Sequence, residues 1–352
     1  MRPAAEEAAS LAPRWELLTQ RTLTELQGCD PVFRPTNFWG PGVEKLLEEM
    51  RTRGLESFKS WPEALFWFYP VYELGLRRRQ RKQLLDLAES FSPSLRRQLR
   101  TRLDGAPAAQ RDFDAARLMW DQDRWPADLE AHGESTVGQP RHLFRLTGSE
   151  IAWGRPYLNY LLCMAALSRH VRTAPKSFLE LGGGFGVLGE LVMARDPEAR
   201  YVNCDIPPLL TVASYYLTTL FGDERVLTYD EQVSSRGQIE VPRSACLPNW
   251  RIGDLEGPFD VFVNAFSFQE MEPEVVQRYV DTVVGLGVSH VVSLNSRKGK
   301  RVAQGEHDIG VLDPVTSSRI VAMFEAHGYT LRGAYNSPLV AGAGELVVLS
   351  RI

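Results

Sequence analysis

The stretch Glu180-Leu181-Gly182-Gly183-Gly184-Phe185-Gly186 is the feature that most restricts the fold of this 352-residue chain. An apolar segment typical of a strand, residues 178–181, runs directly into it, and a helical pattern at 186–195 follows. Glycine adopts positive φ angles readily, and without a Cβ it lets the backbone pass close to a ligand. A strand, a glycine turn and a helix in this order predict a ligand-binding crevice at the carboxyl edge of a parallel sheet.

After residue 177 the sequence alternates short apolar segments with helical patterns, which predicts parallel βαβ units. The expected strands are 178–181, 201–204, 260–264, 290–294, 329–335 and 345–350, with one more near 245–247 in the otherwise irregular region 223–257; the expected helices are 186–195, 208–221, 274–286 and 315–327. A Gly-, Pro- and Asn-rich loop joins the last two strands, so we expect a hairpin that adds an antiparallel strand to the sheet. The predicted fold class is α/β, with a Rossmann-like sheet.

The first part of the chain is predicted to be mainly helical. We therefore divide the chain into a helical substrate-binding or cap region, 1–146, and a Rossmann-like domain, 147–352, which opens with a linker helix at 157–171. Aromatic side chains cluster in the first region, at Trp61, Phe66, Trp67, Phe68, Tyr69 and Tyr72. This density is more typical of a helical core, and the lining of a substrate pocket is the alternative.

Composition narrows the class of protein. The net charge is only -4 and the basic run at 77–82 adjoins a helical pattern, so nucleic acid is not an expected partner. The four cysteines are scattered without a Cys-x-x-Cys pair, which favours reduced thiols over a zinc site or disulfides. Residues 1–13 lack the apolar core of a secretory signal, and no stretch approaches the roughly 18 apolar residues of a membrane span. We expect a soluble, cytoplasmic protein.

The glycine turn fits two cofactors. Gly182-x-Gly184-x-Gly186 matches a turn for S-adenosylmethionine, whereas Gly184-x-Gly186-x-x-Gly189 matches the dinucleotide fingerprint. Asp205 follows Gly184 by 21 residues, where a carboxylate can accept hydrogen bonds from ribose hydroxyls. The acid Glu180 just before the glycines and the terminal hairpin are both typical of class I methyltransferases, and they favour S-adenosylmethionine.

Several segments of the second half resemble one family of such enzymes. They are 178–186, Asp205-Ile206-Pro207, 260–264 with Ser267-Phe268-Gln269-Glu270-Met271 and Tyr279, and Ser293-Leu294-Asn295. Over residues 177–300 the chain resembles the sugar O-methyltransferase family of class I enzymes, with the Ser-Phe-Gln-Glu-Met element the most distinctive match. The resemblance implies S-adenosylmethionine as cofactor and a small-molecule acceptor, a sugar or a peptide among the candidates, and it allows a homodimer.

The expected cofactor-binding residues are those of the turn, its flanking acid and the neighbouring strand ends: Glu180, Gly182, Gly183, Gly184, Gly186, Asp205, Leu247, Asn264 and Phe266. The resemblance places an adenine-binding segment around Leu247, with Asp254 as the competing position. Asn264 could instead satisfy the end of its strand. For the acceptor we expect Tyr157, Ser267 and Gln269, although core packing is the alternative for Tyr157.

Transfer to a hydroxyl requires a group that accepts its proton. Glu270 is the first candidate, and a cap or ion pair at the next helix is its alternative role. His307 is the second candidate because imidazole titrates near neutral pH. Glu306, His307, Asp308 and Asp313 lie close in sequence, but their spacing matches no metal site, so no metal is expected. An oxidoreductase using a nicotinamide cofactor and a non-catalytic homologue are the competing functions.

Overall fold

The computed structural model describes residues 12–73, 78–126, 128–146, 148, 150–235, 237–305 and 308–351. Eight strands form one sheet in the order β3-β4-β2-β1-β5-β6-β8-β7. Their bounds are β1 Ser177–Leu181, β2 Arg200–Asp205, β3 Val226–Thr228, β4 Ser244–Pro248, β5 Val261–Ala265, β6 His290–Ser296, β7 Tyr329–Tyr335 and β8 Gly344–Arg351. The strands predicted from the sequence are all present, and β3 is an additional edge strand in the region predicted to be irregular.

The strand order reverses beside β1. After β1 the chain forms β2, then the edge strand β3, and then β4 between these two, before it returns to the other side of β1 to form β5 and β6. All these neighbours pair in parallel, whereas β8 pairs antiparallel with both β6 and β7. The Rossmann-like sheet and its C-terminal antiparallel hairpin are therefore confirmed. The reversal leaves a crevice at the carboxyl ends of β1 and β5.

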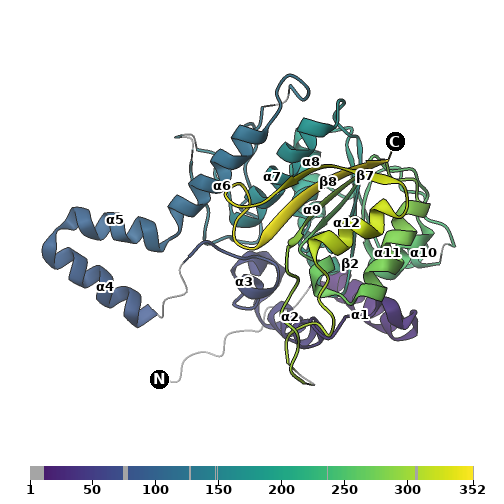
Figure 1. Ribbon diagram of the computed structural model, residues 1–352. Helices are drawn as coiled ribbons and strands as arrows, with labels where there is room; N and C mark the ends of the chain where they lie inside the picture. The colour runs from purple at the N-terminus through teal and green to yellow at the C-terminus, as the bar shows by residue number, and fades with distance from the viewer. Residues whose placement is uncertain are drawn as a thin grey trace, which may run out of the picture.

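Helices cover both faces of the sheet (Figure 1). One face packs against α7 Arg155–His170, α8 Val187–Arg195 and α9 Leu209–Phe221, and the other packs against α11 Pro273–Gly285 and α12 Ser317–Glu325. The short helix α10 spans Glu231–Ser234. Local sequence explains the boundaries: Pro273 starts α11, Gly222 ends α9 with φ +82°, and the Thr316 hydroxyl accepts a hydrogen bond from Arg319 N at α12.

The N-terminal region is helical, as predicted. It contains α1 Pro13–Gly28, η1 Pro31–Phe33, α2 Gly40–Arg53, η2 Leu55–Ser60, α3 Ala64–Trp67, α4 Arg78–Phe91, α5 Pro93–Leu103 and α6 Ala106–Met119. Figure 1 shows α4 and α5 as an arm that projects from the body, while α1 packs on α9 and α6 packs on α7. One hydrophobic cluster runs from the aromatic residues of this region into α7, α8 and α9. The domain division at 146/147 stays a prediction, and so does the homodimer.

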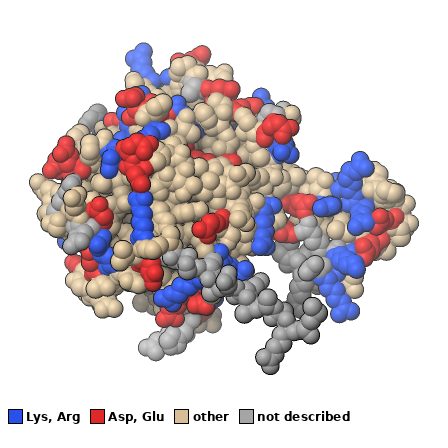
Figure 2. All heavy atoms as spheres, turned by 180° about the vertical axis from the view of Figure 1, so that it is seen from behind, with Lys and Arg blue, Asp and Glu red and all other residues tan. Residues whose placement is uncertain are grey.

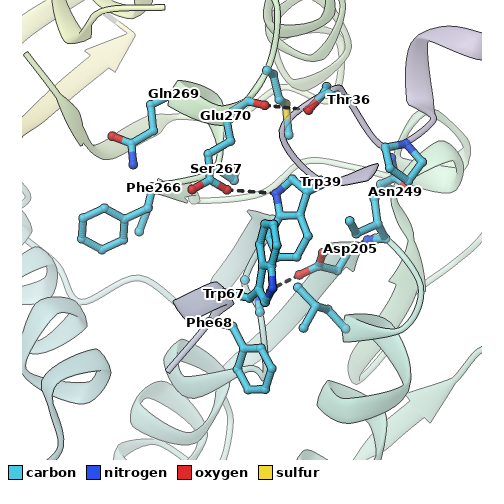
Figure 3. Close-up of a pocket in the computed structure, with 18 of the residues that line it drawn as sticks. Thr36, Trp39, Trp67, Phe68, Asp205, Asn249, Phe266, Ser267, Gln269 and Glu270 are labelled. Carbon is cyan, nitrogen blue, oxygen red and sulfur yellow. Dashed lines mark hydrogen bonds between the residues drawn. The ribbon is translucent and has the colours of Figure 1, made fainter. Parts of the chain in front are cut away.

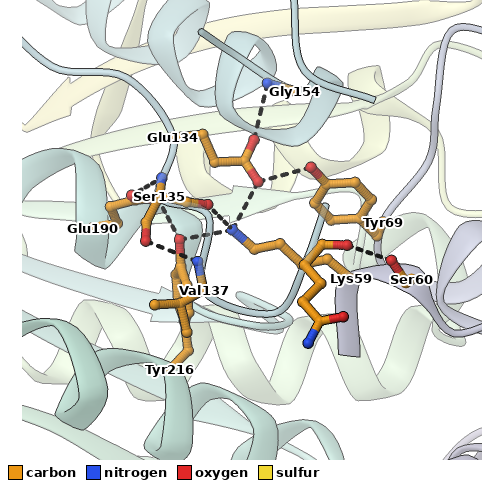
Figure 4. Close-up of polar contacts among 10 residues, drawn as sticks. Lys59, Ser60, Tyr69, Glu134, Ser135, Val137, Gly154, Glu190 and Tyr216 are labelled. Carbon is orange, nitrogen blue, oxygen red and sulfur yellow. Dashed lines mark hydrogen bonds and ion pairs between the residues drawn. The ribbon is translucent and has the colours of Figure 1, made fainter. Parts of the chain in front are cut away.

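A buried polar network joins the N-terminal region to the sheet layer (Figure 4). The ammonium of Lys59 lies 2.8 Å from Glu134 Oε1 and donates to the Tyr216 hydroxyl at 2.9 Å; the Lys59 and Glu134 side chains have no exposed surface. Tyr216 in turn donates to Glu190 of α8, and Tyr69 donates to Glu134. Such a network fixes the position of η2 relative to α8 and α9, because each member would be costly to leave unpaired.

The visible surface is mixed in charge. On the face shown in Figure 2, acidic and basic side chains are interspersed, and Lys and Arg side chains gather at the projecting arm. Arg96, Arg97, Arg100 and Arg102 lie in α5 of that arm. In the described part of the chain, no helix combines the length and apolar character that crossing a membrane requires.

Candidate functional site

The turn after β1 has the backbone that the sequence predicts. Gly182, Gly184 and Gly186 have φ angles of +70°, +58° and +86°. A Cβ on Gly182 would lie 2.5 Å from the Ser267 hydroxyl oxygen, and one on Gly183 would lie 2.5 Å from a Glu180 carboxylate oxygen. Both the φ angles and the close neighbours therefore require glycine in this turn.

A cavity of about 300 Å³ lies above the turn, at the carboxyl ends of β1, β2 and β5. Its walls combine the glycine turn and the strand ends with residues of the N-terminal region, as Figure 3 shows for Trp39, Trp67 and Phe68. The predicted site residues that line it are Gly182, Gly183, Gly184, Asp205, Phe266, Ser267, Gln269 and Glu270. A cavity of this size is at the lower end of the range for small-molecule sites.

Asp205 lies at the end of β2 on the cavity wall, as predicted. Its carboxylate accepts hydrogen bonds from the backbone N–H groups of Gly184 and Ile206, both at 2.7 Å. Burial raises the pKa of Asp205 to about 8, and the neighbouring charges of Glu180 and Glu270 add to the increase, while the two N–H donors oppose it. The side chain therefore connects the tip of the glycine turn to β2.

Glu180 lies beneath the turn and does not line the cavity. It has no exposed surface, and its Oε2 accepts a hydrogen bond from the Tyr201 hydroxyl at 2.5 Å. Burial raises its pKa to about 7, which the hydroxyls of Tyr160 and Tyr201 partly offset. In this structure Glu180 supports the turn from below, and its direct contact with a cofactor stays a prediction.

The end of β5 presents several predicted residues through a connected set of hydrogen bonds. Asn264 is buried and donates to Leu181 O at 3.1 Å and to the Ser267 hydroxyl at 2.6 Å, and its Oδ1 accepts from Asn295. Asn264 therefore satisfies the strand end, below the cavity wall. Phe266 has a φ of +67°, an uncommon conformation for a residue other than glycine. Strain of this kind is typical of functional sites.

Gln269 lines both the main cavity and a second cavity of about 140 Å³. Its Oε1 accepts a hydrogen bond from Ser296 N at 2.7 Å, which fixes the orientation of the amide. The two cavities share Arg155, Asn159, Phe266 and Gln269 in their walls. The sequence-predicted acceptor residue Gln269 therefore lies where two spaces meet.

Glu270, the first candidate for proton transfer, lies on the wall of the main cavity (Figure 3). Its Oε1 is 2.9 Å from the ammonium of Lys300, and its Oε2 accepts a hydrogen bond from Trp39 Nε1 at 2.9 Å. The backbone oxygen of Glu270 also accepts from the Thr36 hydroxyl at 2.7 Å. Burial raises the pKa of Glu270, while Lys300 and Trp39 lower it.

Three other predicted residues lie elsewhere. Leu247 is buried in β4 and does not line the cavity, whereas Asn249, two residues later, does. Tyr157 is buried in α7 and donates to His132 O at 3.3 Å, whereas Tyr160 lines the cavity. His307 and Glu306 lie outside the described residues. Within the described part of the chain, no group of three or more His, Cys, Asp or Glu side chains could hold a metal ion.

Part of the cavity wall, most of it from the N-terminal region, was not among the predicted site residues. Thr36, Trp39, Trp67, Phe68 and Lys300 line the cavity together with the predicted residues. The aromatic cluster at residues 61–72 was the only sequence signal for this wall. Some of its side chains form the helical core and others line the cavity. Its Trp61 and Tyr69 belong to the core, whereas its Phe66, Trp67 and Phe68 line the cavity.

Comparisons with known proteins give matches to solved structures only. No family model and no curated protein matches the chain. Among solved structures it is similar to the pyocyanin biosynthetic protein PhzM, with 16% identity over 55% of this chain and 58% of that protein and a TM-score of 0.37. It is also similar to mitomycin 7-O-methyltransferase MmcR, with 16% identity over 56% and 58% and a TM-score of 0.38. The match spans less than two thirds of either protein, and at these values we draw no functional argument from it.

Proposed function

We propose that this chain is a methyltransferase that uses S-adenosylmethionine to methylate an oxygen of a small molecule. The observation that carries the proposal is the glycine turn. Its glycines have positive φ angles, and its backbone lines a cavity at the point where the strand order reverses. The antiparallel β8 next to β6 supports this cofactor over a dinucleotide, because dehydrogenase sheets usually lack such a strand.

The residues around the cavity fit the cofactor. We propose that the turn at Gly182, Gly183 and Gly184 holds it by backbone contact, and that Asp205 accepts hydrogen bonds from its ribose. Asn249 and Phe266 line the same cavity and are further candidates for contact. When bound there, S-adenosylmethionine would supply a methyl group activated by a positively charged sulfur.

The protein itself must align the acceptor and take up its proton. We propose Glu270 for the second task, because its carboxylate reaches the cavity wall and the ion pair with Lys300 favours its charged form. His307 remains the second candidate. Ser267 and Gln269, on the same wall, are proposed to orient the acceptor.

For the acceptor, we propose a hydroxyl on a sugar or on a glycosylated small molecule of natural-product biosynthesis. This follows from the resemblance of the segment around Ser267-Phe268-Gln269-Glu270-Met271 to sugar O-methyltransferases. Methylation of a carboxylate or an amine, on a small molecule or a peptide, is the alternative. A carboxylate needs no general base, so the effect of removing Glu270 separates the alternatives.

Isothermal titration calorimetry with S-adenosylhomocysteine and with NAD tests the proposal. We expect S-adenosylhomocysteine to bind and NAD not to bind. Gly182→Ala should weaken that binding by at least about 10-fold, because strained φ angles and displaced backbone each cost on the order of 1–3 kcal/mol. Gly285→Ala is the matched control, since nothing lies within 4 Å of a Cβ there. Binding of NAD alone would replace our proposal with an oxidoreductase, and binding of neither would favour a non-catalytic homologue.

A further inference from the structure

Arg155 is a cation with an unusual environment at the junction of the two cavities. It is the first residue of α7, and its side chain lines both the main cavity and the second one. Its Nε atom is buried and has no hydrogen-bond partner among the described residues. One terminal nitrogen donates to Val71 O at 3.0 Å, and the guanidinium lies 5.3 Å from the centroid of the Tyr72 ring. A buried donor without a partner is costly, so the Nε–H of this side chain is available to a further acceptor.

Among the residues that the structure describes, no acid forms an ion pair with Arg155. Within the described residues, no carboxylate oxygen lies within 4.0 Å of the Arg155 nitrogens. Asp112 also lines the second cavity, but its carboxylate accepts from the Tyr72 hydroxyl at 2.7 Å and from Arg111 at 2.7 and 2.9 Å. Asp112 is therefore already paired with a different arginine.

The other polar groups of the shared wall are also able to donate. Because Gln269 Oε1 accepts from Ser296 N, the remaining group of that amide is the NH₂ donor. The Asn159 side chain, one turn after Arg155 in α7, has no hydrogen bond to any residue that the structure describes. The N-terminal end of α7 adds its own positive partial charge beside these groups.

Apolar side chains also line the place where the two cavities meet. The Phe266 ring borders both cavities, and Figure 3 shows Phe266 and Gln269 pointing to the same side, away from Trp39. Trp67 and Phe68 also line the main cavity. A ring can lie against these side chains while a charged substituent reaches the donors.

We propose that the methyl acceptor is an acidic small molecule, and that its carboxylate binds Arg155, Asn159 and Gln269 while its ring lies against Phe266. This inference rests on the proposed methyltransferase function and specifies its substrate class. Arg155 would act as a specificity-determining residue, because a guanidinium presents paired donors that match a carboxylate. A neutral acceptor would leave the charge of Arg155 unpaired.

The experiment compares ligands that differ only in the charged group. Phenyl β-glucuronide is titrated against phenyl β-glucoside, and 2-naphthoate against 2-naphthamide, into the full-length protein saturated with S-adenosylhomocysteine. We expect each acid to bind about 10–100-fold more tightly than its neutral partner, the range for hydrogen bonds to a charged group. Arg155→Met should remove this preference while affinity for S-adenosylhomocysteine is kept.

Two further variants separate charge from folding. Gln269→Glu keeps the acceptor for Ser296 N but places a negative charge where the two cavities meet. This variant should therefore bind the acidic ligands more weakly and the neutral ligands with unchanged affinity. Arg172→Met is the matched control, because Arg172 is exposed just beyond the far end of α7 and should leave all affinities unchanged. Equal binding of acid and neutral ligand, or binding of neither acid below about 1 mM, would overturn the inference. Failure to bind S-adenosylhomocysteine would instead overturn the proposed function.

Discussion

Two pairs of lysine and glutamate connect distant parts of this chain, and they differ in their access to the cavity. Lys59 and Glu134 are 2.8 Å apart with no exposed surface, in the network behind the glycine turn. Lys300 and Glu270 are 2.9 Å apart, with 32% and 11% of their side chains exposed, on the cavity wall. The same two residue types therefore serve stability in one place and are available for chemistry in the other.

The surroundings explain this difference. Lys59 is enclosed by aromatic rings, with the Tyr216 and Phe185 centroids 4.4 and 5.1 Å from its ammonium, and it donates to Ser135 O and to the Tyr216 hydroxyl. Glu270 has a Trp39 donor and the Lys300 cation on one side and open space on the other. A carboxylate needs that open side to exchange a proton with a ligand.

Glu270→Gln should have the largest effect. If Glu270 accepts the proton of a hydroxyl acceptor, the rate of methyl transfer should fall by about 10²–10⁴-fold with little change in affinity for S-adenosylhomocysteine. Steady-state rates and calorimetry measure the two quantities. A loss below about threefold with a verified hydroxyl substrate would exclude this role and favour a carboxylate acceptor.

A second variant checks the same role. Lys300 lowers the pKa of Glu270, so Lys300→Met should raise it. The acid limb of the pH–rate profile should then move to higher pH, because a base must lose its proton before it can act. An unmoved acid limb would show that another group titrates there.

Lys59→Met should have the next largest effect, on stability. It would leave two buried carboxylates, Glu134 and Glu190, without their cation, and breaking a buried pair costs about 3–5 kcal/mol. Lys300→Met is the matched comparison and should cost at most about 1 kcal/mol, because that pair is partly exposed. Urea unfolding of both variants gives the two values. Equal losses of unfolding free energy in the two variants would mean that access to the cavity does not distinguish the two lysine–glutamate pairs.

The smallest expected effect is a pH dependence of the unfolding free energy that comes from Glu190. Burial raises its pKa from 4.5 to about 7, although Lys59 opposes the increase. The folded protein therefore holds this proton more tightly than the unfolded chain does, and its contribution to stability is lost as pH rises from about 4.5 to 7. Glu190→Gln should reduce this loss by on the order of 1–3 kcal/mol, measured as unfolding free energy at both ends of that range. An unchanged slope would exclude Glu190 as its source.

The sequence predicted the sheet and one side of the site well, because both depend on local patterns. Alternating apolar segments identified β1, β2, β5 and β6, and the residues directly after such strands must meet at one edge. Asp205 and Glu270 could therefore be placed on the crevice before the structure was known. The short edge strand β3 was missed, since three residues give too weak a pattern.

The sequence by itself determined the glycine turn, the parallel sheet with its antiparallel end, and the residues at the carboxyl edge of the strands. Only the tertiary structure decided what covers that edge, because those contacts join residues far apart in the chain. Trp39 and Glu270 are 231 positions apart, and the cavity that joins Arg155 to Gln269 also depends on packing between separate elements. No local pattern encodes such distances, since they are set by how whole layers pack against one another.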